Sequence, residues 1–329
     1  MLKTIAFGEI LIDFLSDKLT DETNLANETF TKFPGGAPAN VAAAVARLGG
    51  NSYFAGKIAQ DSFGKFLENS LLDMGVKTDY IKYATNKKTA LAFVSLDDKG
   101  ERSFEFYREE TADLDFHSTD FDQEWFTEPG IFHICSNTLT DADIAASTLT
   151  GQKMAVDAYW LVSFDVNLRL NLWKDKSETR KRIWDCIKLS HIIKLSKEEL
   201  EYMCDEQNKV DTINKMLNCG ASIVIITDAS NTLRYYMNSG SGEVFPPNAE
   251  INDSTAAGAA FVGGLLYSIA KANMTRHDLN NLKANTAQLN EILYFACCCG
   301  AFAVTRKGAF TALANLEDLN TYMSSNNND

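Results

Sequence analysis

The sequence predicts an α/β fold, a doubly wound and mostly parallel sheet with helices on both faces, together with a small second β-sheet. Short apolar runs rich in β-branched residues alternate with helical segments along most of the chain, which is typical of a parallel sheet. One pair of β-runs interrupts this alternation and predicts the second sheet. The 329 residues include 45% hydrophobic side chains, enough for one large core. We therefore predict a single domain over residues 1–329.

The N-terminal part begins with a near-continuous apolar run at residues 4–15, which predicts one buried strand. After "FPGG", the small residues of 37–50 predict a helix that stops at its two final glycines. Residues 52–59 then read as a strand and 63–76 as a helix. Within 89–107, two β-runs flank "DDKG" and predict a hairpin that protrudes from the alternating core.

The alternation resumes after residue 130. The predicted strands are residues 131–137, 161–167, 191–196 and 221–229. The predicted helices are residues 141–159, 177–190, 197–204 and 210–220. Two shorter β-runs, 233–238 and 242–248, predict a smaller hairpin before a group of C-terminal helices. Only the final "SSNNND" is predicted to be disordered.

Composition excludes several classes of partner. A net charge of −13 repels phosphodiester backbones and anionic lipids, so we expect no nucleic acid and no membrane partner. The N-terminal residues lack a signal-peptide pattern, and we find no apolar run of about 18 residues. The seven cysteines include Cys297–Cys299 but no CxxC pair. We interpret them as small core residues in a reducing cytosol, because this spacing does not suit a metal or redox centre.

The stretch "NDSTAAGAAFVGGLLY" reads as a polar turn that leads into a helix. Asp253, Ser254 and Thr255 are predicted to cap the helix start with their side-chain oxygens. The bare backbone around Gly258 would attract an anion such as phosphate, since free N–H groups and the helix dipole point at it. An ordinary well-capped core helix shows the same pattern. A phosphate-transferring enzyme usually keeps a base here, and this chain has Ala259.

Two N-terminal features are candidate binding positions. The glycines of "PGGAPAN" would allow close approach of a ligand to the backbone, although an ordinary strand-to-helix turn reads the same way. Asn40 would face inward on the first helical turn, where a polar ligand could satisfy its amide. Asp13 lies inside an apolar run, where a carboxylate is costly unless it is paired or directed into a site. A strand-end position facing water is the alternative for Asp13.

Two later segments follow predicted strands at the edge where parallel sheets bind ligands. "SFDVNLRLNLW" places Asp165, Asn167 and Arg169 just past a strand, either at a site or in a solvated loop. "KLSKEEL" brings Lys194, Ser196 and Glu199 to a strand-to-helix junction. Glu199 either complements the helix dipole or holds water around a magnesium ion, and spacing alone leaves both readings open.

Taken together, these segments resemble the PfkB-type, ribokinase-like carbohydrate kinases, most closely the bacterial fructokinases. The motifs that carry the resemblance are "FPGGAPANVAAAVARLGG", "GKIAQDSFGKF", "LAFVSLDDKGERSFEFYR", "FHICSNTLT", "VSFDVNLRLNLW" and "FAVTRKGAF". They occur in the family's order over nearly the whole chain, which is more specific than any single motif. The resemblance implies a ribokinase-like fold whose lid strands come from about residues 10–35 and 88–110.

The resemblance also implies a reaction, transfer of the ATP γ-phosphate to a sugar hydroxyl with Mg²⁺. The implied sugar contacts are Asp13, Gly35, Gly36, Asn40, Phe104, Phe106, Arg108 and Asn167. The implied nucleotide contacts are Lys194, Ser196, Glu199, Thr227, Ala229 and Gly258. Ala257 and Gly258 would form the anion hole beside Arg169, and Glu199 would hold Mg²⁺ through water. A K⁺ or similar ion, where the family has one, would use Asp253, Thr255 and carbonyls near Ala303, Arg306 and Gly308. The resemblance also allows a homodimer through the lid.

The chain departs from the family pattern at several positions. The family motif D-T-T-G-A-G-D is "DSTAAGA" here, so Ala259 stands where the resemblance implies the Asp that deprotonates the sugar hydroxyl. Ser196 replaces the family's Asn, Ala229 a Gly, and Val166 a Pro. A placed base contributes about 10²–10⁴-fold to rate, and no neighbour of Ala259 can replace it. The backbone anion hole needs no side chain, so ligand binding is expected to survive.

We therefore predict a fructokinase-like scaffold that binds a ketose and ATP, with severely impaired turnover. Ribose, a 2-keto-3-deoxy sugar acid or a nucleoside remain alternative substrates. A catalytically inactive sugar sensor or pseudokinase is the alternative from another class. Whether Ala259 was engineered or arose naturally is left open by the sequence.

Overall fold

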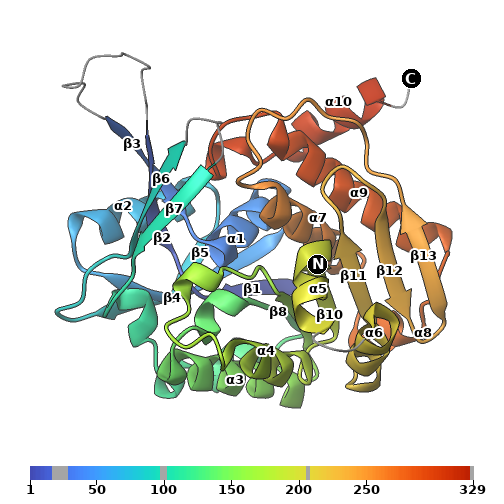
Figure 1. Cartoon of the computed structure of the whole chain (residues 1–329), viewed down its shortest axis with the longest axis horizontal. Helices are drawn as coiled ribbons and strands as arrows, with labels where there is room; N and C mark the ends of the chain where they lie inside the picture. Colours follow the sequence, from blue (N-terminus) through green and yellow to red (C-terminus); the bar gives the residue numbers. More distant parts are fainter. Residues whose placement is uncertain (17–28, 97–101, 205–207, 327–329) are drawn as a thin grey trace.

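The computed structural model describes residues 1–16, 29–96, 102–204 and 208–326. Within these residues, the larger sheet has nine strands in the order β13-β12-β11-β10-β9-β8-β1-β4-β5 (Figure 1). The strands are β1 (Lys3–Phe7), β4 (Asn51–Ala59), β5 (Lys77–Ala84), β8 (Gly130–Cys135), β9 (Leu161–Asp165), β10 (Ile192–Ser196), β11 (Ile223–Thr227), β12 (Leu233–Met237) and β13 (Gly240–Val244). All neighbours pair in parallel except β11–β12 and β12–β13. The predicted doubly wound sheet is confirmed, and strand order reverses direction between β1 and β8.

Helices cover both faces of this sheet because each presents one apolar stripe to the strands. One face carries α1 (Ala37–Arg47), α2 (Ser62–Asp73), α7 (Ala257–Lys271), α8 (Arg276–Asn281) and α9 (Ala287–Val304). The other face carries α3 (Ala142–Asp157), α4 (Thr179–Ile187), α5 (Lys197–Cys204) and α6 (Lys209–Asn218). Figure 1 shows α3 and α4 below the sheet, while α9 and α10 (Leu316–Asn326) lie above it.

The second sheet projects from one end of the molecule and is called the lid here (Figure 1). It contains β3 (Phe30–Gly35), β2 (Leu11–Ser16), β6 (Leu91–Leu96) and β7 (Arg102–Tyr107) in that order. The predicted hairpin is confirmed, because β6 and β7 pair antiparallel. The "DDKG" turn between them lies outside the described residues. Aromatic contacts hold the lid together, such as the stacked rings of Phe14 and Phe93 at 5.2 Å.

The prediction of one strand over residues 4–15 was wrong. This run forms β1 of the large sheet and β2 of the lid, separated at Gly8–Ile10. Gly8 has φ +150°, and a Cβ there would lie 2.6 Å from Cγ of Pro38, so only glycine fits this bend. The apolar run is continuous because both strands are buried, and hydrophobicity alone does not mark the change of sheet. The sequence reading also missed β5, whose mostly alternating, polar pattern is typical of an edge strand.

Two predictions about helix ends were also wrong. The N-cap of α7 is Ala256, with no side-chain cap, and the Asp253 carboxylate accepts instead from the N–H of Thr255 and of Gly308. Tertiary contact with the C-terminal loop therefore outcompetes local capping. The predicted disorder from residue 324 is contradicted, since α10 continues to Asn326. The last three residues lie outside the described part of the chain.

The cysteine-rich helix α9 belongs to the core. By length and hydropathy alone it could cross a membrane, but nine of its residues, including Cys297–Cys299, are buried against the fold. All seven cysteines are free, and the described residues contain no cluster of three or more potential metal ligands. Six of the seven thiols are buried and pack as small apolar side chains, as the sequence predicted, whereas Cys219 is partly exposed.

Candidate active site

Two cavities adjoin each other at the carboxyl ends of the parallel strands, beside the point where strand order reverses. The first, called the lid cavity, has a volume of about 600 Å³ and lies under β7. The second, called the edge cavity, has a volume of about 230 Å³ and lies toward β11 and β12. Lys194, Ser254 and Gly258 line both cavities. A ligand in one cavity can therefore meet a ligand in the other at the start of α7.

The lid cavity gathers most of the residues that the sequence predicted. The predicted residues that line it are Asp13, Gly36, Asn40, Phe104, Phe106, Asn167, Arg169, Lys194, Ser196, Glu199, Thr255, Gly258 and Ala259. Two predicted sugar contacts, Gly35 and Arg108, do not line it. The chain thus brings together segments from β2, α1, the lid, and the loops after β9 and β10.

The glycines at this site differ in whether the surrounding protein requires a residue without a side chain. A Cβ at Gly35 would clash with the Asp13 carboxylate, and one at Gly36 would lie 2.5 Å from the carbonyl of Glu9. Gly36 also has φ +105°, which disfavours other residues. At Gly258 the nearest atom to an added Cβ is Nζ of Lys194 at 3.7 Å, so the protein itself does not demand glycine. The open space at Gly258 faces both cavities.

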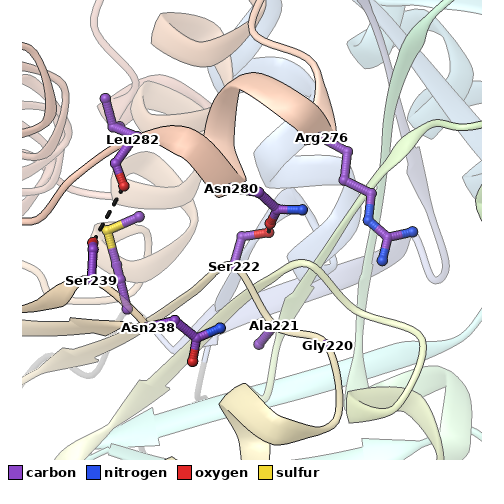
Figure 2. A pocket seen from close by; sticks show the side chains of 9 residues that line it. Gly220, Ala221, Ser222, Asn238, Ser239, Arg276, Asn280 and Leu282 are labelled. Carbon is purple, nitrogen blue, oxygen red and sulfur yellow. Dashed lines mark hydrogen bonds between the residues drawn. The ribbon is translucent and has the colours of Figure 1, made fainter.

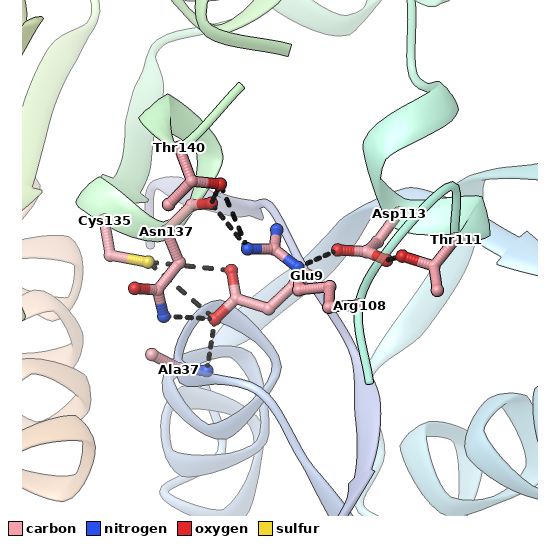
Figure 3. Close-up of polar contacts among 8 residues, drawn as sticks. All are labelled: Glu9, Ala37, Arg108, Thr111, Asp113, Cys135, Asn137 and Thr140. Carbon is pink, nitrogen blue, oxygen red and sulfur yellow. Dashed lines mark hydrogen bonds and ion pairs between the residues drawn. The ribbon is translucent and has the colours of Figure 1, made fainter. Parts of the chain in front are cut away.

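A buried polar network fixes the floor of the lid cavity (Figure 3). Oε1 of Glu9 accepts from the Ala37 N–H at 3.0 Å and from Nδ2 of Asn137 at 2.9 Å. Burial raises the pKa of Glu9, and this effect outweighs the opposing charge of Arg108 and the hydrogen bonds. The carboxylate therefore ties the start of α1 to the segment after β8.

Arg108 belongs to this network rather than to the cavity wall. Its Nε donates to Asp113 at 2.6 Å, and its Nη1 donates to the Asn137 carbonyl at 2.9 Å. Both members of the ion pair are almost completely buried. Arg108 thus anchors the end of lid strand β7 to the large sheet (Figure 3).

Several polar atoms that border the lid cavity have no hydrogen-bond partner within the described structure. They are Oδ1 of Asn40, Oδ1 of Asn137 and Nε2 of His133. All three side chains are buried, and an unsatisfied buried polar atom costs about 1–3 kcal/mol. Burial, followed by the charge of Lys194, lowers the pKa of His133 to about 3. The imidazole is therefore neutral at ordinary pH, and the three atoms suit a polar, uncharged ligand.

A buried ion pair lies at the junction of the two cavities. Nζ of Lys194 lies 3.0 Å from Oδ1 of Asp165, and both side chains are about nine-tenths buried. Burial opposes the charge on Lys194, but Asp165 and then Glu199 outweigh it and raise its pKa. The cation is therefore held in place where the cavities meet.

Glu199 connects two loops of the site. Its Oε1 accepts from the Leu168 N–H and its Oε2 from the Ser196 N–H, each at 2.7 Å. Burial, aided by Asp165, raises its pKa, while Lys194 opposes the shift. Each carboxylate oxygen keeps a further lone pair that can accept a hydrogen bond from water. The carboxylate is thus more than a helix-dipole partner.

The loop after β9 carries Asn167, Arg169 and Asn171 into the lid cavity. Asn167 has φ +36°, an unusual backbone conformation for a residue other than glycine. Arg169 is exposed and close enough to Lys194 to affect its pKa. Nδ2 of Asn171 donates to the carbonyl of Phe104 at 3.2 Å and so joins this loop to the lid.

The edge cavity has an apolar lining. Apolar side chains on its walls include Leu233, Pro246, Pro247, Ile251, Phe261 and Val304. The predicted nucleotide residues Thr227 and Ala229 also line it. Ala229 has φ +48°, the left-handed region in which a glycine would be unstrained. An apolar slot that opens onto a cationic junction suits a flat ring carrying an anionic tail.

Helix α7 begins between the two cavities. Ala257 lines the edge cavity, whereas Ala259 lines the lid cavity. The N–H groups of Gly258 and Ala259 lie in the first helical turn and have no intrahelical acceptor. No acidic residue occurs in this first turn. The backbone can therefore bind an anion, but the turn offers no carboxylate to act as a base.

The predicted cation loop is also assembled. The Asp253 carboxylate accepts from the Thr255 N–H at 2.8 Å and the Gly308 N–H at 3.0 Å. Oγ1 of Thr255 is buried without a partner in the described residues. The carbonyl of Ala303 accepts from the N–H of Arg306. These segments lie together directly behind the start of α7.

The sequence reading missed Glu9, His133, Asn137 and Asn171 as site residues. Glu9 was detectable, because it lies in the same apolar run as Asp13. A carboxylate buried in such a run is costly unless it is paired or directed into a site. His133 and Asn137 flank the end of a strand that was correctly predicted. Nothing local marks Asn171, whose contact with the lid arises only through tertiary structure.

The chain is similar to known proteins over most of its length. The family model described as pfkB family carbohydrate kinase matches residues 1–315. A probable chloroplastic fructokinase-6 of Arabidopsis thaliana is 37% identical over 316 residues, covering 95% of this chain and 80% of that protein. The crystal structure of fructokinase with bound ATP from Xylella fastidiosa has a TM-score of 0.93 and 41% identity, with 99% of each chain covered. A Vibrio cholerae O395 fructokinase in fructose, ADP and calcium ion bound form has a TM-score of 0.86 and 30% identity, covering 98% of this chain and 99% of that one.

Proposed function

Because the chain belongs to the pfkB family of carbohydrate kinases and is fructokinase-like throughout, we propose that it binds a ketohexose and ATP but transfers phosphate very slowly. Fructose is the sugar we expect in the lid cavity, and ATP the nucleotide in the edge cavity. The observation that carries the proposal is that Lys194, Ser254 and Gly258 line both cavities. A phosphate group at this junction would meet both ligands.

Each part of the site has a role in this proposal. Asp13, Asn40 and the unpartnered atoms of Asn137 and His133 hold the sugar hydroxyls. Lys194 and Arg169 neutralise charge on the phosphate group, and the first N–H groups of α7 donate hydrogen bonds to it. Positioning and charge neutralisation account for most phosphoryl-transfer catalysis. Position 259 is alanine and offers no proton acceptor. We expect this absence to lower the rate about 10²–10⁴-fold.

The donor set fits a magnesium ion bound mainly through water. The described residues contain no three-carboxylate cluster, and Mg²⁺ commonly keeps several waters beside the nucleotide phosphates. Glu199, with free lone pairs at the junction, would hold such waters, and the ion would neutralise phosphate charge. For a monovalent cation, the unpartnered Oγ1 of Thr255 beside the Asp253 carboxylate is the observation that fits.

Rates of ADP formation with fructose, measured on this chain and on Ala259→Asp side by side, test the proposal. Ala257→Asp is the matched control, because it adds the same charge to the same turn but on the edge-cavity side. We expect Ala259→Asp alone to raise turnover by at least about a hundredfold. Ordinary turnover by the unmodified chain would show that our assignment of position 259 is wrong.

A second outcome identifies a different function. If both proteins are inactive while fructose and ATP still bind, the chain acts as a sugar sensor. Two residues of one site favour this alternative, Ala259 and the strained Ala229. Both depart from the family pattern implied by the resemblance. Thermal denaturation with fructose, ribose, 2-keto-3-deoxy sugar acids and nucleosides distinguishes the possible sugars.

We also propose a cytoplasmic location and a homodimer through the lid. Tyr107 is 55% exposed on the lid, and Phe104, which also lines the lid cavity, is 37% exposed. A second lid would cover these rings. Sedimentation analysis of the protein and of Tyr107→Ser tests the dimer, and a monomer at all concentrations would contradict it.

A further inference from the structure

A third cavity lies at the opposite ends of the strands from the active site. It is called the Arg276 cavity here and has a volume of about 330 Å³. Its walls come from residues 220–222 at the start of β11, residues 237–239 after β12, and α8 with the residue that follows it. Figure 2 shows the side chains of Arg276, Asn280 and Asn238 around the backbone of Gly220 and Ala221. The cavity is large enough for a small metabolite.

The lining of this cavity combines apolar side chains, such as Met237 and Leu282, with polar groups and one arginine. Arg276 is half-buried, and the described residues contain no ion pair to its guanidinium. No Asp or Glu is among the described residues that line the cavity. The nearest carboxylate along α8, Asp278, is already bound by the N–H and hydroxyl of Thr275. In a chain of net charge −13, an arginine that faces a cavity without an acidic partner favours an anion.

The surrounding contacts make the cavity a fixed feature of the fold. The hydroxyl of Ser222 is bonded to Asn280, which joins the start of β11 to α8. Ser239 donates to the carbonyl of Leu282 at 3.3 Å and accepts from the Ala284 N–H at 3.0 Å, so the turn after β12 is held as well (Figure 2). The walls therefore do not depend on a ligand to bring them together.

The buried imidazole of His191 behind this wall adds no charge. Burial, followed by the charge of Arg276, lowers its pKa to about 4. The His191 carbonyl accepts from the Ser222 N–H at 2.8 Å. Arg276 is thus the cationic group that an anion in this cavity would meet.

We propose that the Arg276 cavity binds a small metabolite through an oxyanion, either a carboxylate or a phosphate group. The guanidinium of Arg276 offers paired N–H donors that match such a group, and Asn238 and Asn280 contact the remaining polar atoms. This site is separate from the sugar and nucleotide cavities. Strands β11 and β12 nevertheless connect it to the edge cavity, because Thr227 and Leu233 lie at the other ends of these two strands.

Calorimetric titration of the protein saturated with a non-hydrolysable ATP analogue tests this site, since the triphosphate of the analogue also fills the anion site proposed at the start of α7. Inorganic phosphate and citrate are the two probes, and they distinguish the phosphate from the carboxylate source. We expect saturable binding of at least one probe, weakened about tenfold or more by Arg276→Gln. Lys283→Gln is the matched control, because it removes the same charge from the adjoining loop outside the cavity.

A second variant keeps the test independent of folding. Asn238 is exposed at a turn, and Asn238→Asp places a carboxylate on the cavity wall. We expect this variant to weaken binding as well, because the carboxylate repels the anionic probe. Thermal denaturation without ligand confirms that each variant is folded. The proposal is overturned if neither probe binds saturably with a dissociation constant below about 10 mM, which corresponds to a binding free energy near −2.7 kcal/mol. Equal affinities in the unmodified protein, Arg276→Gln and Asn238→Asp would overturn it as well.

Discussion

Replacement of Lys194 by methionine tests how the buried ion pair maintains the junction of the two cavities. Nζ of Lys194 lies 3.0 Å from Asp165, with 10% and 7% of the two side chains exposed. A methionine side chain at this position would fill a similar volume but leave Asp165 buried without its partner. Removal of one member of a buried pair costs about 3–5 kcal/mol, whereas replacing both by uncharged groups is often neutral. We therefore expect Lys194→Met to lower the free energy of unfolding by about 3–5 kcal/mol.

The double variant Asp165→Asn/Lys194→Met provides the decisive comparison. It removes both charges and is expected to recover most of the lost stability. Glu199 keeps its two backbone hydrogen bonds, so its carboxylate remains partly satisfied. Urea denaturation at pH 7, followed by tryptophan fluorescence, gives the free energy for each protein. Our reasoning is refuted if Lys194→Met changes the free energy of unfolding by less than about 1 kcal/mol. It is also refuted if the double variant loses as much stability as Lys194→Met and Asp165→Asn lose in sum.

Three further predictions concern strain, the lid and pH. Ala229→Gly is expected to stabilise the fold by about 0.5–1 kcal/mol, because it relieves left-handed strain at some cost in backbone entropy; a lower urea midpoint would contradict this. In an Ala259→Asp background, Asn171→Ala is expected to raise KM for fructose about two- to tenfold by releasing the carbonyl of Phe104, and an unchanged KM would argue against this role. His133 has a folded pKa of about 3, below its unfolded value, so the unfolded state binds a proton first and stability falls as pH drops below about 6.5. His133→Gln is expected to reduce the loss of unfolding free energy between pH 7 and 4, measured by denaturation at each pH, and an equally large loss would count against this prediction.

The acid dependence and the cavity chemistry have a common origin. His133 and Glu9 are buried in the floor of the lid cavity, and burial disfavours the charged form of each. A neutral imidazole and amide oxygens that have no partner within the described residues then offer hydrogen-bonding groups that suit an uncharged ligand. The buried cation Lys194 lies at the junction, beside Gly258, whereas Asp13 adds a carboxylate to the lid cavity itself. The site thus has a largely uncharged polar floor and a buried cation at the junction, the division that the proposed function requires.

Much of the fold follows from local pattern. The alternation of apolar runs with helical segments predicted the parallel sheet and both helical layers, because each element must bury one face or stripe. The ordered motifs predicted the family, and Asn40 was correctly expected to carry an amide in need of a partner. That position 259 carries no titratable side chain is likewise visible in the sequence, since it depends on the identity of one residue.

Tertiary structure alone decided the features that depend on distant contacts. The resemblance placed a lid strand from about residue 10, but the point of division within residues 4–15 depends on Gly8, which permits a bend against Pro38 where hydrophobicity is continuous. Arg108 points to Asp113 and the backbone of Asn137 rather than into the lid cavity, since a buried guanidinium requires a paired carboxylate. The Arg276 cavity joins three segments that are far apart along the chain, and no periodicity marks them. Local pattern specifies which side chains need burial or partners, and only the folded chain determines which partners they obtain.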